Sequence, residues 1–335
     1  MKIFELDGLK HTIEKSQHIV IVAHKNPDGD AVGSSLGLYL LLKEVFPQKE
    51  IHVILPNKFP EFLEWLPQQE QILFFDQDNS RSREKIAQAD LIFTLDFNSF
   101  GRTGQMSQSL SASKAEFVLI DHHQQPDDFA VYTYSDTSIG STCEMIYTTI
   151  QHLDYTSYMT SEIGECLYTG IMTDTGSFKF PSTSSTTHRI IADLIDLGVD
   201  NSKIHQNTYD NSNLSRLELL GVAMNNLKVV AEKKAAYISL SQEELDKNNF
   251  KKGDTEGFVN YALSLKDVDL AVIFIENKSE EIIKISLRSF GDIDVNKLAR
   301  QYFEGGGHQN AAGGKSDLSM SETITKFEKI LTDEF

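Results

Sequence analysis

Short apolar runs recur along the first half of the chain and predict buried β-strands. They are rich in β-branched or large side chains and lie at residues 18–23, 51–55, 90–95 and 116–120. Runs that are almost continuously apolar are typical of parallel strands covered on both faces. Because helical patterns alternate with several of these runs, we predict an α/β fold with a parallel sheet in this half of the chain.

Helices are predicted between and after these strands. The first is expected over residues 31–46, because the turn-forming sequence Asn26-Pro27-Asp28-Gly29 precedes it and Pro47 ends it. Three further helices are expected at residues 141–152, 160–172 and 186–197. With no internal repeat and no low-complexity segment, the architecture of this half is defined by these alternating elements.

A polar, asparagine-rich stretch divides the chain. We therefore predict a first domain at residues 1–200, a linker at 201–215 and a smaller α/β domain at 216–335. The elements expected in the smaller part are a helix at 214–226, strands at 227–230, 236–240, 270–276 and 282–287, and a helix at 295–302.

Composition places the chain among globular proteins. It has 335 residues, of which 40% are hydrophobic and 24% are charged, so neither disorder nor a fibrous repeat fits. No stretch approaches the roughly 20 apolar residues of a membrane helix. The start, Met1-Lys2-Ile3-Phe4-Glu5, lacks the features of a signal peptide. We expect a cytoplasmic protein with no membrane partner.

Cysteine usage and charge exclude further classes. Only Cys143 and Cys166 occur, without metal-type spacing, so a disulfide framework and a zinc ribbon are excluded and both are expected to be buried thiols. The formal net charge is −18, from 31 basic and 49 acidic residues. Such a surface repels long polyanions, so we expect no binding of long duplex nucleic acid. An anionic substrate should be small and held by a few cations or metal ions.

Polar side chains follow three of the predicted strands. His24 follows the first strand, Asp96 the third and Asp121-His122-His123 the fourth, and ligands of open α/β sheets lie at the carboxyl ends of strands. The segment from His24 to Asp30 adds two carboxylates within seven residues. Taken alone, this segment is equally consistent with an ordinary Pro-Asp-Gly turn. Together with Asp174 it predicts a site for a divalent ion such as Mn²⁺, which suits mixed carboxylate and imidazole ligands.

The order of these motifs strongly resembles that of the DHH family of phosphoesterases. The resemblance rests on His24-x-x-x-Asp28-x-Asp30, Asp96, the triplet Asp121-His122-His123, and Asp174. The glycine-rich segment at residues 305–314 resembles the signature of the DHH-associated C-terminal domain. The resemblance covers nearly the whole chain, and the two-domain layout is similar to the branch of nanoRNases and pAp phosphatases.

The resemblance implies a site for two Mn²⁺ ions. One ion would be held by His24, Asp28 and Asp96. The other would be held by Asp30, Asp96, His122 and Asp174, so that Asp96 bridges the pair. Asp121 would orient an imidazole, and His123 would face the scissile phosphate, although His123 could also be a structural partner in its loop. Two such ions can activate a shared water and stabilise the attacking and leaving oxygens.

Additional groups are needed to bind the substrate's phosphates, because the ligand carboxylates neutralise the ions. Arginine gives bidentate phosphate contacts, and glycines let backbone amides approach an anion. Besides His123, the candidates are Arg288, Ser289, Gly306, Gly307, His308 and Arg102. Each has a plainer alternative: Arg288 could be a solvated strand residue, Arg102 a turn residue, and the glycines a flexible connection.

The function that we predict is hydrolysis of very short RNA from one end, with the 5′ end favoured, together with conversion of 3′-phosphoadenosine 5′-phosphate to AMP. A cyclic or linear dinucleotide phosphodiesterase shares these motifs, and a family II inorganic pyrophosphatase shares the metal chemistry. A non-catalytic nucleotide-binding regulator is the alternative from another class. The sequence leaves open whether the chain forms a homodimer and which aromatic residues stack on bases.

Overall fold

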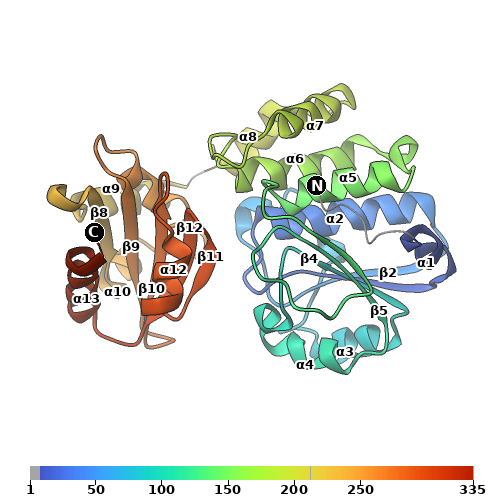
Figure 1. Cartoon of the computed structure of the whole chain (residues 1–335), viewed down its shortest axis with the longest axis horizontal. Coiled ribbons are helices and arrows are strands. Elements are labelled where there is room, and N and C mark those ends of the chain that lie inside the picture. Colours follow the sequence, from blue (N-terminus) through green and yellow to red (C-terminus); the bar gives the residue numbers. More distant parts are fainter. Residues whose placement is uncertain (1–7, 212, 335) are drawn as a thin grey trace. The chain divides into compact units, whose positions relative to one another are not determined.

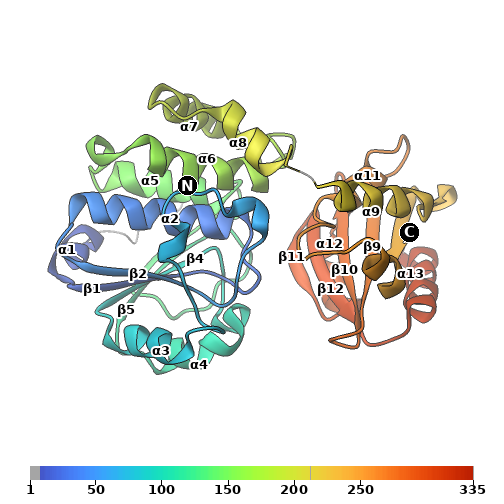
Figure 2. The same ribbon diagram turned by 180° about the vertical axis from the view of Figure 1, so that it is seen from behind.

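The computed structural model describes residues 8–211 and 213–334. The chain divides into two compact units, residues 1–211 and 212–335. Each unit contains its own sheet and its own hydrophobic core, and each is described by itself below (Figures 1 and 2).

The first unit is built on a parallel sheet with strand order β3-β2-β1-β4-β5-β6. The strands are β1 (His18–Val22), β2 (Glu50–Leu55), β3 (Leu73–Phe74), β4 (Leu91–Leu95), β5 (Glu116–Asp121) and β6 (Tyr132–Ser135). Strand β1 is central, and its Ile19 lies opposite Ile51 of β2 and Leu91 of β4. The parallel sheet predicted from the apolar runs is therefore confirmed.

Helices cover both faces of this sheet (Figure 1). On one face lie α2 (Gly29–Val45), α5 (Thr142–His152) and α6 (Ser161–Asp174), and on the other lie α3 (Asn79–Gln88) and α4 (Ser107–Ala112). Alternate residues of β1 serve the two faces, because Ile19 and Ile21 join one core and Val20 and Val22 the other. The remaining helices of the unit are α1 (Leu9–Lys15), α7 (Ser185–Asp196) and α8 (Asn201–Thr208).

Helices α2 and α6 pack unusually closely beside the candidate site. A Cβ at Gly29 of α2 would fall on the side chain of Thr173 of α6, and a Cβ at Gly33 of α2 would fall on the Cys166 carbonyl oxygen of α6. Only glycine permits such an approach of two helix backbones. This contact brings Asp30 near the start of α2 and Asp174 at the end of α6 to the same edge of the unit.

The second unit is built on a mixed sheet with strand order β11-β12-β10-β9-β8-β7. Its strands are β7 (Lys228–Val230), β8 (Ala235–Leu240), β9 (Leu270–Asn277), β10 (Ile282–Ser289), β11 (Gly306–His308) and β12 (Ala311–Ser316). Strands β8 and β9 run parallel, and the other neighbours are antiparallel. Helices α12 (Val295–Tyr302) and α13 (Met320–Glu334) share one core with the sheet. Helices α9 (Leu214–Asn225), α10 (Gln242–Lys247) and α11 (Phe258–Leu263) share the other (Figure 2).

Two segments differ from the sequence-based expectation. The glycine-rich segment, expected to be a loop, forms the antiparallel pair β11–β12, in which Gly306 lies opposite Gly313. The expected linker at 201–215 contains α8 and the first residues of α9. The polar composition of this segment gave no signal for helix α8. The helix is stabilised by its N-cap, Asp200, which accepts a hydrogen bond from the Lys203 amide, and by the burial of Ile204.

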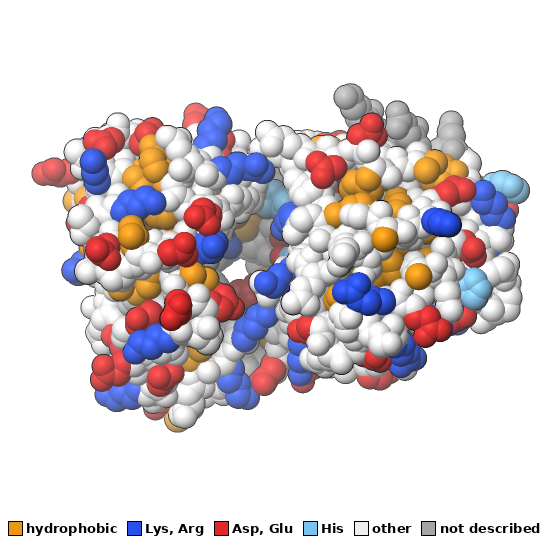
Figure 3. Space-filling view, turned by 90° about the horizontal axis from the view of Figure 1, so that it is seen from below, with side chains coloured by type: hydrophobic (Ala, Val, Ile, Leu, Met, Phe, Trp, Pro, Cys, Tyr) orange, Lys and Arg blue, Asp and Glu red, His pale blue; other side chains and the backbone are white. Residues whose placement is uncertain are grey.

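Short 3₁₀ helices complete the connections. They are η1 (Glu61–Leu63), η2 (Gln69–Gln71), η3 (Phe100–Met106), η4 (Thr156–Tyr158) and η5 (Ala231–Lys233). Acidic and basic side chains are interspersed on the face shown in Figure 3. In the part of the chain that the structure describes, no helix has both the length and the apolar character needed to cross a membrane.

Candidate metal centre

Histidine and aspartate side chains gather beyond the carboxyl ends of three neighbouring strands. His24 lies just past β1, Asp96 directly follows β4, and Asp121 is the last residue of β5. Because β1, β4 and β5 are adjacent and parallel, these ends share one edge of the sheet. Asp28 and Asp30 reach the same edge from the start of α2.

His24 forms one group with two carboxylates. Its Nε2 lies 3.3 Å from Asp96 Oδ2 and 3.8 Å from Asp28 Oδ2. The other nitrogen, Nδ1, lies 2.9 Å from the Lys25 carbonyl oxygen, which accepts a hydrogen bond from it. Asp28 is fixed as the N-cap of α2, since its Oδ1 accepts from the amides of Asp30 and Ala31, both at 3.1 Å. The second oxygen of Asp28 is therefore directed at His24.

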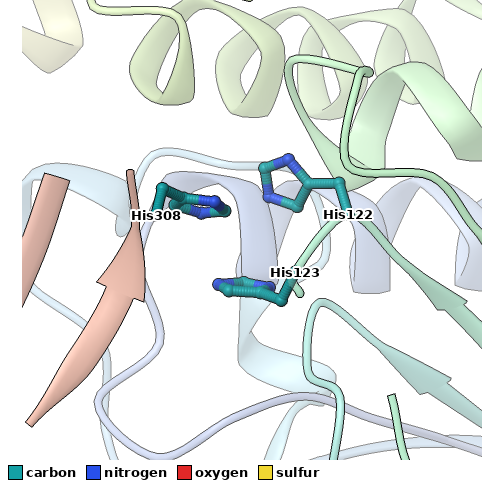
Figure 4. Close-up of side chains that lie close together, drawn as sticks. All are labelled: His122, His123 and His308. Carbon is teal, nitrogen blue, oxygen red and sulfur yellow. The ribbon is translucent and has the colours of Figure 1, made fainter. Parts of the chain in front are cut away.

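His122, whose ring Figure 4 shows beside that of His123, lies at the centre of a second group. Its Nε2 is 3.4 Å from Asp174 Oδ2, 3.4 Å from Asp96 Oδ1 and 3.7 Å from Asp30 Oδ2. Its Nδ1 lies 3.2 Å from the Ile139 carbonyl oxygen. When Nδ1–H donates to that carbonyl, the lone pair of Nε2 faces three carboxylates, which is the arrangement of a metal-ligating histidine.

Asp96 has one oxygen in each group. Its Oδ2 faces His24, and its Oδ1 faces His122 and accepts from the Thr142 hydroxyl at 3.2 Å. The backbone of Asp96 has φ of 63°, in the left-handed region, which is uncommon for residues other than glycine. Strain of this kind often accompanies functional positions. Here the conformation is part of the backbone geometry that presents the Asp96 carboxylate between the two imidazoles.

Asp30 is held at the N-terminus of α5. Its Oδ2 accepts from the Thr142 amide at 2.6 Å, and its Oδ1 accepts from the Cys143 amide at 2.9 Å. The first amides of a helix lack intrahelical partners, so a carboxylate there is stabilised by hydrogen bonds and by the helix dipole. The start of α5 thus fixes the orientation of Asp30.

His123 and Asp121 form a buried pair. His123 Nδ1 lies 2.7 Å from Asp121 Oδ1, which accepts a hydrogen bond from it, while Asp121 Oδ2 is buried without a hydrogen-bond partner among the described residues. Burial, followed by repulsion from Asp96, raises the pKa of Asp121 to about 7. This bond fixes the orientation of the His123 ring.

The protonation of the two other histidines reflects the excess of acidic groups around them. Burial opposes the charge on His24, but the hydrogen bond to Asp96 and the charges of Asp28 and Asp96 outweigh it and raise its pKa to about 9. Burial likewise opposes protonation of His122, yet Asp96, Asp174 and Asp30 hold its pKa well above the usual range.

The carboxylates show the same imbalance. Burial, and then the charges of Asp96 and Asp174, raises the pKa of Asp30 well above its usual value. Burial likewise raises the pKa of Asp174 to about 7. Asp96 is the exception: burial opposes its charge, but hydrogen bonds from His122 and His24 hold its pKa well below the usual range. Crowded carboxylates and imidazoles that need a compensating positive charge fit divalent cations with oxygen and nitrogen ligands.

Residues 8–211 contain three groups of possible ligands, and within each group the ligand atoms lie no more than 4.8 Å from one another. They are His24, Asp28 and Asp96; Asp30, His122 and Asp174; and Asp96, Asp121 and His123. The structure therefore brings together every metal-ligand candidate that the sequence analysis named. Asp174, however, is the last residue of helix α6 rather than the end of a strand or loop. A carboxylate at a helix C-terminus is disfavoured by the helix dipole, which a nearby cation would offset.

Helix α6 ends abruptly after Asp174. Gly176, Ser177 and Phe178 all have positive φ, of 58°, 59° and 67°. Left-handed conformation costs roughly 1–2 kcal/mol for each residue other than glycine. The chain accepts this cost directly beside the candidate ligand, as expected of a segment whose geometry is set by the site rather than by local preference.

Arg102 lies in the same unit, on η3. Its carbonyl oxygen accepts from the Lys25 amide at 2.8 Å, which ties η3 to the segment after His24. Its charge lowers the pKa of both His24 and Asp121, although it is not the main influence on either. Arg102 is therefore close to the candidate metal centre, and its contact with a substrate phosphate stays a prediction.

In the second unit, the glycine-rich hairpin is supported by α12. Asn296 Oδ1 accepts from the Gly307 amide at 2.9 Å and from Arg300 Nε at 3.2 Å. A Cβ at Gly305 would fall on the Gly313 carbonyl oxygen, so the two strands approach more closely than any side chain allows. His308 is the last residue of β11 (Figure 4).

Arg288 and Ser289 end strand β10, next to this hairpin. Arg288 lies opposite Ala311 of β12 and Ala271 of β9, so it belongs to a central strand and not to an edge. Its Nη1 donates to the Leu287 carbonyl at 2.9 Å. Ser289 is buried, and its hydroxyl donates to the Ile293 carbonyl at 2.6 Å and accepts from Asn310 Nδ2 at 3.0 Å. These bonds give Ser289 a structural place in the turn, and a contact with substrate stays a prediction.

Several residues that shape the two candidate sites were not identified from the sequence. Thr142 and Cys143 supply the amides that hold Asp30, and Asn296 and Asn310 hold the hairpin and its neighbouring turn. The Ser141 N-cap signal places Thr142 and Cys143 in the first turn of α5, but nothing in the sequence shows which carboxylate their amides receive.

Comparisons with known proteins agree with this geometry. The model of the DHH family N-terminal domain matches residues 18–171, and that of the DHHA1 domain matches residues 232–335. The bifunctional oligoribonuclease and PAP phosphatase NrnA of Thermus thermophilus is 30% identical over 320 residues, which cover 93% of this chain and 88% of that protein. The chain belongs to the DHH family. The resemblance inferred from the ordered motifs is thereby confirmed.

Two further relatives extend over nearly the full chain. The protein of the same name from Bacillus subtilis is 28% identical over 327 residues, which cover 97% of this chain and 96% of that protein. The crystal structure of an exopolyphosphatase-related protein from Bacteroides fragilis is 42% identical, with a TM-score of 0.93 and coverage of 98% of this chain and 95% of that one.

Proposed function

We propose that this DHH protein is a metal-dependent phosphoesterase that hydrolyses very short RNA and converts 3′-phosphoadenosine 5′-phosphate to AMP. The observation that carries the proposal is Asp96, whose two oxygens each face a different imidazole of the candidate metal centre. The substrates are supported by the relatives from Bacillus subtilis and Thermus thermophilus, which are named for these two activities.

Two Mn²⁺ ions are the cofactor that we propose. His24, Asp28 and Asp96 would hold one ion, and Asp30, Asp96, His122 and Asp174 the other. The ions would supply an activated water and the positive charge that stabilises the attacking and leaving oxygens of the phosphoester. The protein's contribution is to orient the ligands: the Ile139 carbonyl fixes His122, and the amides of α5 fix Asp30.

His123 is proposed to contact the reacting phosphate. The bond of its Nδ1 to Asp121 fixes the ring orientation, so Nε2 can donate a proton to a phosphate oxygen when the imidazole is charged. Asp121 acts through His123 and is a positioning residue. In the second unit, Gly306, Gly307, His308 and Arg288 are proposed to bind a further phosphate, with Ser289 holding the turn beside them.

Charge favours short substrates. With a net charge of −18, the protein repels a long RNA, and no basic stripe is evident in the sequence to compensate for that repulsion. We therefore propose attack from an end, with the 5′ end favoured. Cytoplasmic location stays a prediction.

The experiment that tests this function measures cleavage by the Mn²⁺-loaded protein of end-labelled RNAs of two to about twenty nucleotides. We expect release of mononucleotides from one terminus and a kcat/KM that falls as the RNA lengthens. Added salt should narrow this length dependence by screening the repulsion. A parallel reaction with 3′-phosphoadenosine 5′-phosphate should release phosphate. Internal cuts, or faster cleavage of long strands, would contradict attack from an end.

The same substrate panel separates the alternatives. Cyclic and linear dinucleotides test the phosphodiesterase alternative, because preference for a cyclic dinucleotide over short RNA would replace the proposed substrate. Pyrophosphate tests the pyrophosphatase alternative, because preferred hydrolysis of pyrophosphate over short RNA would support that activity instead. Binding of nucleotides without any metal-dependent turnover would support a non-catalytic regulator instead.

A further inference from the structure

A cavity of about 430 Å³ lies in the first unit, away from the candidate metal centre. Tyr39 and Lys43 of α2 line it together with Arg81 of α3, and these two helices lie on opposite faces of the sheet (Figure 1). Its other walls include Ile51 at the start of β2 and Leu73 of β3. The cavity therefore opens along the outer edge of β2, and its volume is in the range of sites for small molecules.

The position along the strands separates this cavity from the metal centre. The register places Glu50, at the start of β2, opposite His18 at the start of β1. His24 follows the other end of β1, six residues further along. At about 3.3 Å per strand residue, the two sites are roughly 20 Å apart along the sheet. A ligand in the cavity would not touch the metal ligands.

The floor of the cavity is an uncovered strand edge. Strand β3 pairs only with Ile54 and Leu55 of β2, so within residues 8–211 the outer edge of residues 50–53 has no strand partner. Such an edge presents backbone N–H and C=O groups to whatever fills the space beside it. Paired donors and acceptors of this kind suit the hydrogen-bonding edge of a heterocyclic base.

Cations outweigh anions in the lining. The Glu50 carboxylate is already occupied, because His52 Nε2 lies 3.0 Å from its Oε1, Lys85 bonds the same oxygen, and His18 Nδ1 lies 3.1 Å from Oε2. Arg81 has no hydrogen bond or ion pair to any described residue.

Lys43 reaches only two carbonyl oxygens, of Pro47 and Lys49, at 3.4 and 3.3 Å. Neither contact neutralises its charge, so both Lys43 and Arg81 can receive an anion. In a chain with a net charge of −18, a cavity with two uncompensated cations is a departure from the general charge balance.

Three lining side chains, those of Tyr39, Ile51 and Leu73, are apolar or aromatic, whereas Gln48, Lys49 and Gln71 add polar groups. Lys49 donates to the carbonyl oxygens of Ile13, Glu14 and Ser16. Tyr39 is half-buried and packs against the hydrophobic core, and Ile51 is buried. The apolar surface of these three side chains, the strand edge at residues 50–52 and the two cations provide surfaces for a planar base and for a phosphate within one cavity.

We propose that this cavity is a second nucleotide site, which binds a nucleoside monophosphate with its phosphate against Arg81 and Lys43 and its base beside β2. The choice of a monophosphate rests on the proposed function, because both hydrolyses release one as product. The site would thus let the enzyme sense its product at a place other than the metal centre.

The test is calorimetric titration of the full chain with AMP, adenosine and inorganic phosphate. We use the wild-type protein, treated with EDTA so that the metal centre contributes little, and the Asp96→Asn variant as an independent way of disabling that centre. Arg81→Glu removes the proposed phosphate contact, and Lys114→Glu makes the same change in net charge at an exposed lysine of the same unit. Circular dichroism confirms that each variant is folded.

We expect AMP to bind both the EDTA-treated and the Asp96→Asn proteins. Binding should weaken roughly tenfold or more in Arg81→Glu, as lost charge-assisted contacts do, and stay unchanged in Lys114→Glu. Adenosine and phosphate should each bind more weakly than AMP. Equal binding of adenosine and AMP, no effect of Arg81→Glu, or no binding once the metal centre is disabled would each overturn the proposal.

The experiment distinguishes failure of the second site from failure of the proposed function. If the wild-type protein hydrolyses neither RNA nor 3′-phosphoadenosine 5′-phosphate, yet AMP binding depends on Arg81, then the catalytic proposal fails and the second site stands. If hydrolysis is found but AMP binding does not depend on Arg81, the catalytic proposal stands and the second site fails.

Discussion

Loading the metal-free protein with Mn²⁺ should displace protons from the candidate ligands. Burial and the surrounding charges raise the pKa of Asp174 to about 7, and hydrogen bonding to Asp96 raises that of His24 to about 9 despite burial. His122 is likewise held in its charged form by three carboxylates. A metal ion binds carboxylate and neutral imidazole, so these protons must leave when the ion enters.

The number of protons released on Mn²⁺ binding follows from these pKa values. At pH 6, His24 is almost fully protonated and Asp174 is about nine-tenths protonated, so these two groups release about two protons. His122 and Asp30, whose pKa values are also raised, add to this number. At pH 8, Asp174 has already lost its proton, and the total falls by about one. The apparent metal affinity should therefore rise more steeply between pH 6 and 7 than above pH 8.

The assay is calorimetric titration of EDTA-stripped protein with Mn²⁺, repeated in buffers of different ionisation enthalpy so that released protons are counted directly. In the Asp174→Asn variant, the difference between pH 6 and pH 8 should disappear. An Asp210→Asn variant, at an exposed carboxylate of the same unit, should behave like wild type. Mn²⁺ binding without proton release at pH 6 would refute the assignment of these residues as ligands.

Three further predictions concern the same residues and the hairpin. Asp96→Ala should reduce hydrolysis more than any other single ligand change, because it disconnects both imidazoles from a shared carboxylate; initial rates with Mn²⁺ measure this. Gly305→Ala should raise KM and leave bound metal unchanged, because the added Cβ displaces Gly313; metal analysis beside kinetics checks it. The raised pKa of Asp121, about 7, favours folding below pH ~4, and this contribution is lost as pH rises through about 7; urea unfolding of metal-free protein, compared with Asp121→Asn, measures it.

The sheet and the candidate ligands could be predicted because each depends on local sequence. Four continuous apolar runs correspond to β1, β2, β4 and β5, since strands buried on both faces need apolar residues throughout. His24, Asp96 and His122 follow those strands, whereas Asp28, Asp30 and Asp174 lie at helix ends. The order of the motifs along the chain was enough to identify all six. Strands β3 and β6 were missed, because β3 has only two residues and β6 has four, of which only Tyr134 is buried.

The glycine-rich segment shows a limit of local signals. Repeated glycines are typical of flexible loops, yet here they allow two strands to approach so closely that no side chain fits at Gly305. The structure of this segment also depends on Asn296, which receives the Gly307 amide from a separate helix. A side chain that acts through a contact between distant elements leaves no local pattern.

The geometry around Asp96 depends both on local sequence and on contacts between distant elements. Its identity and its place after a strand are local, but a bridging role requires its two oxygens to face His24 and His122, which are separated by about a hundred residues. That orientation depends on a left-handed backbone at Asp96, on the Thr142 hydroxyl from α5, and on adjacent strands β1, β4 and β5. Each of these contacts is set by the packing of the sheet against α2 and α5. A Cβ at Gly33 of α2 would fall on the Cys166 carbonyl oxygen of α6 and would meet no ligand. Substitution of Gly33 should therefore disturb the metal centre without touching a ligand.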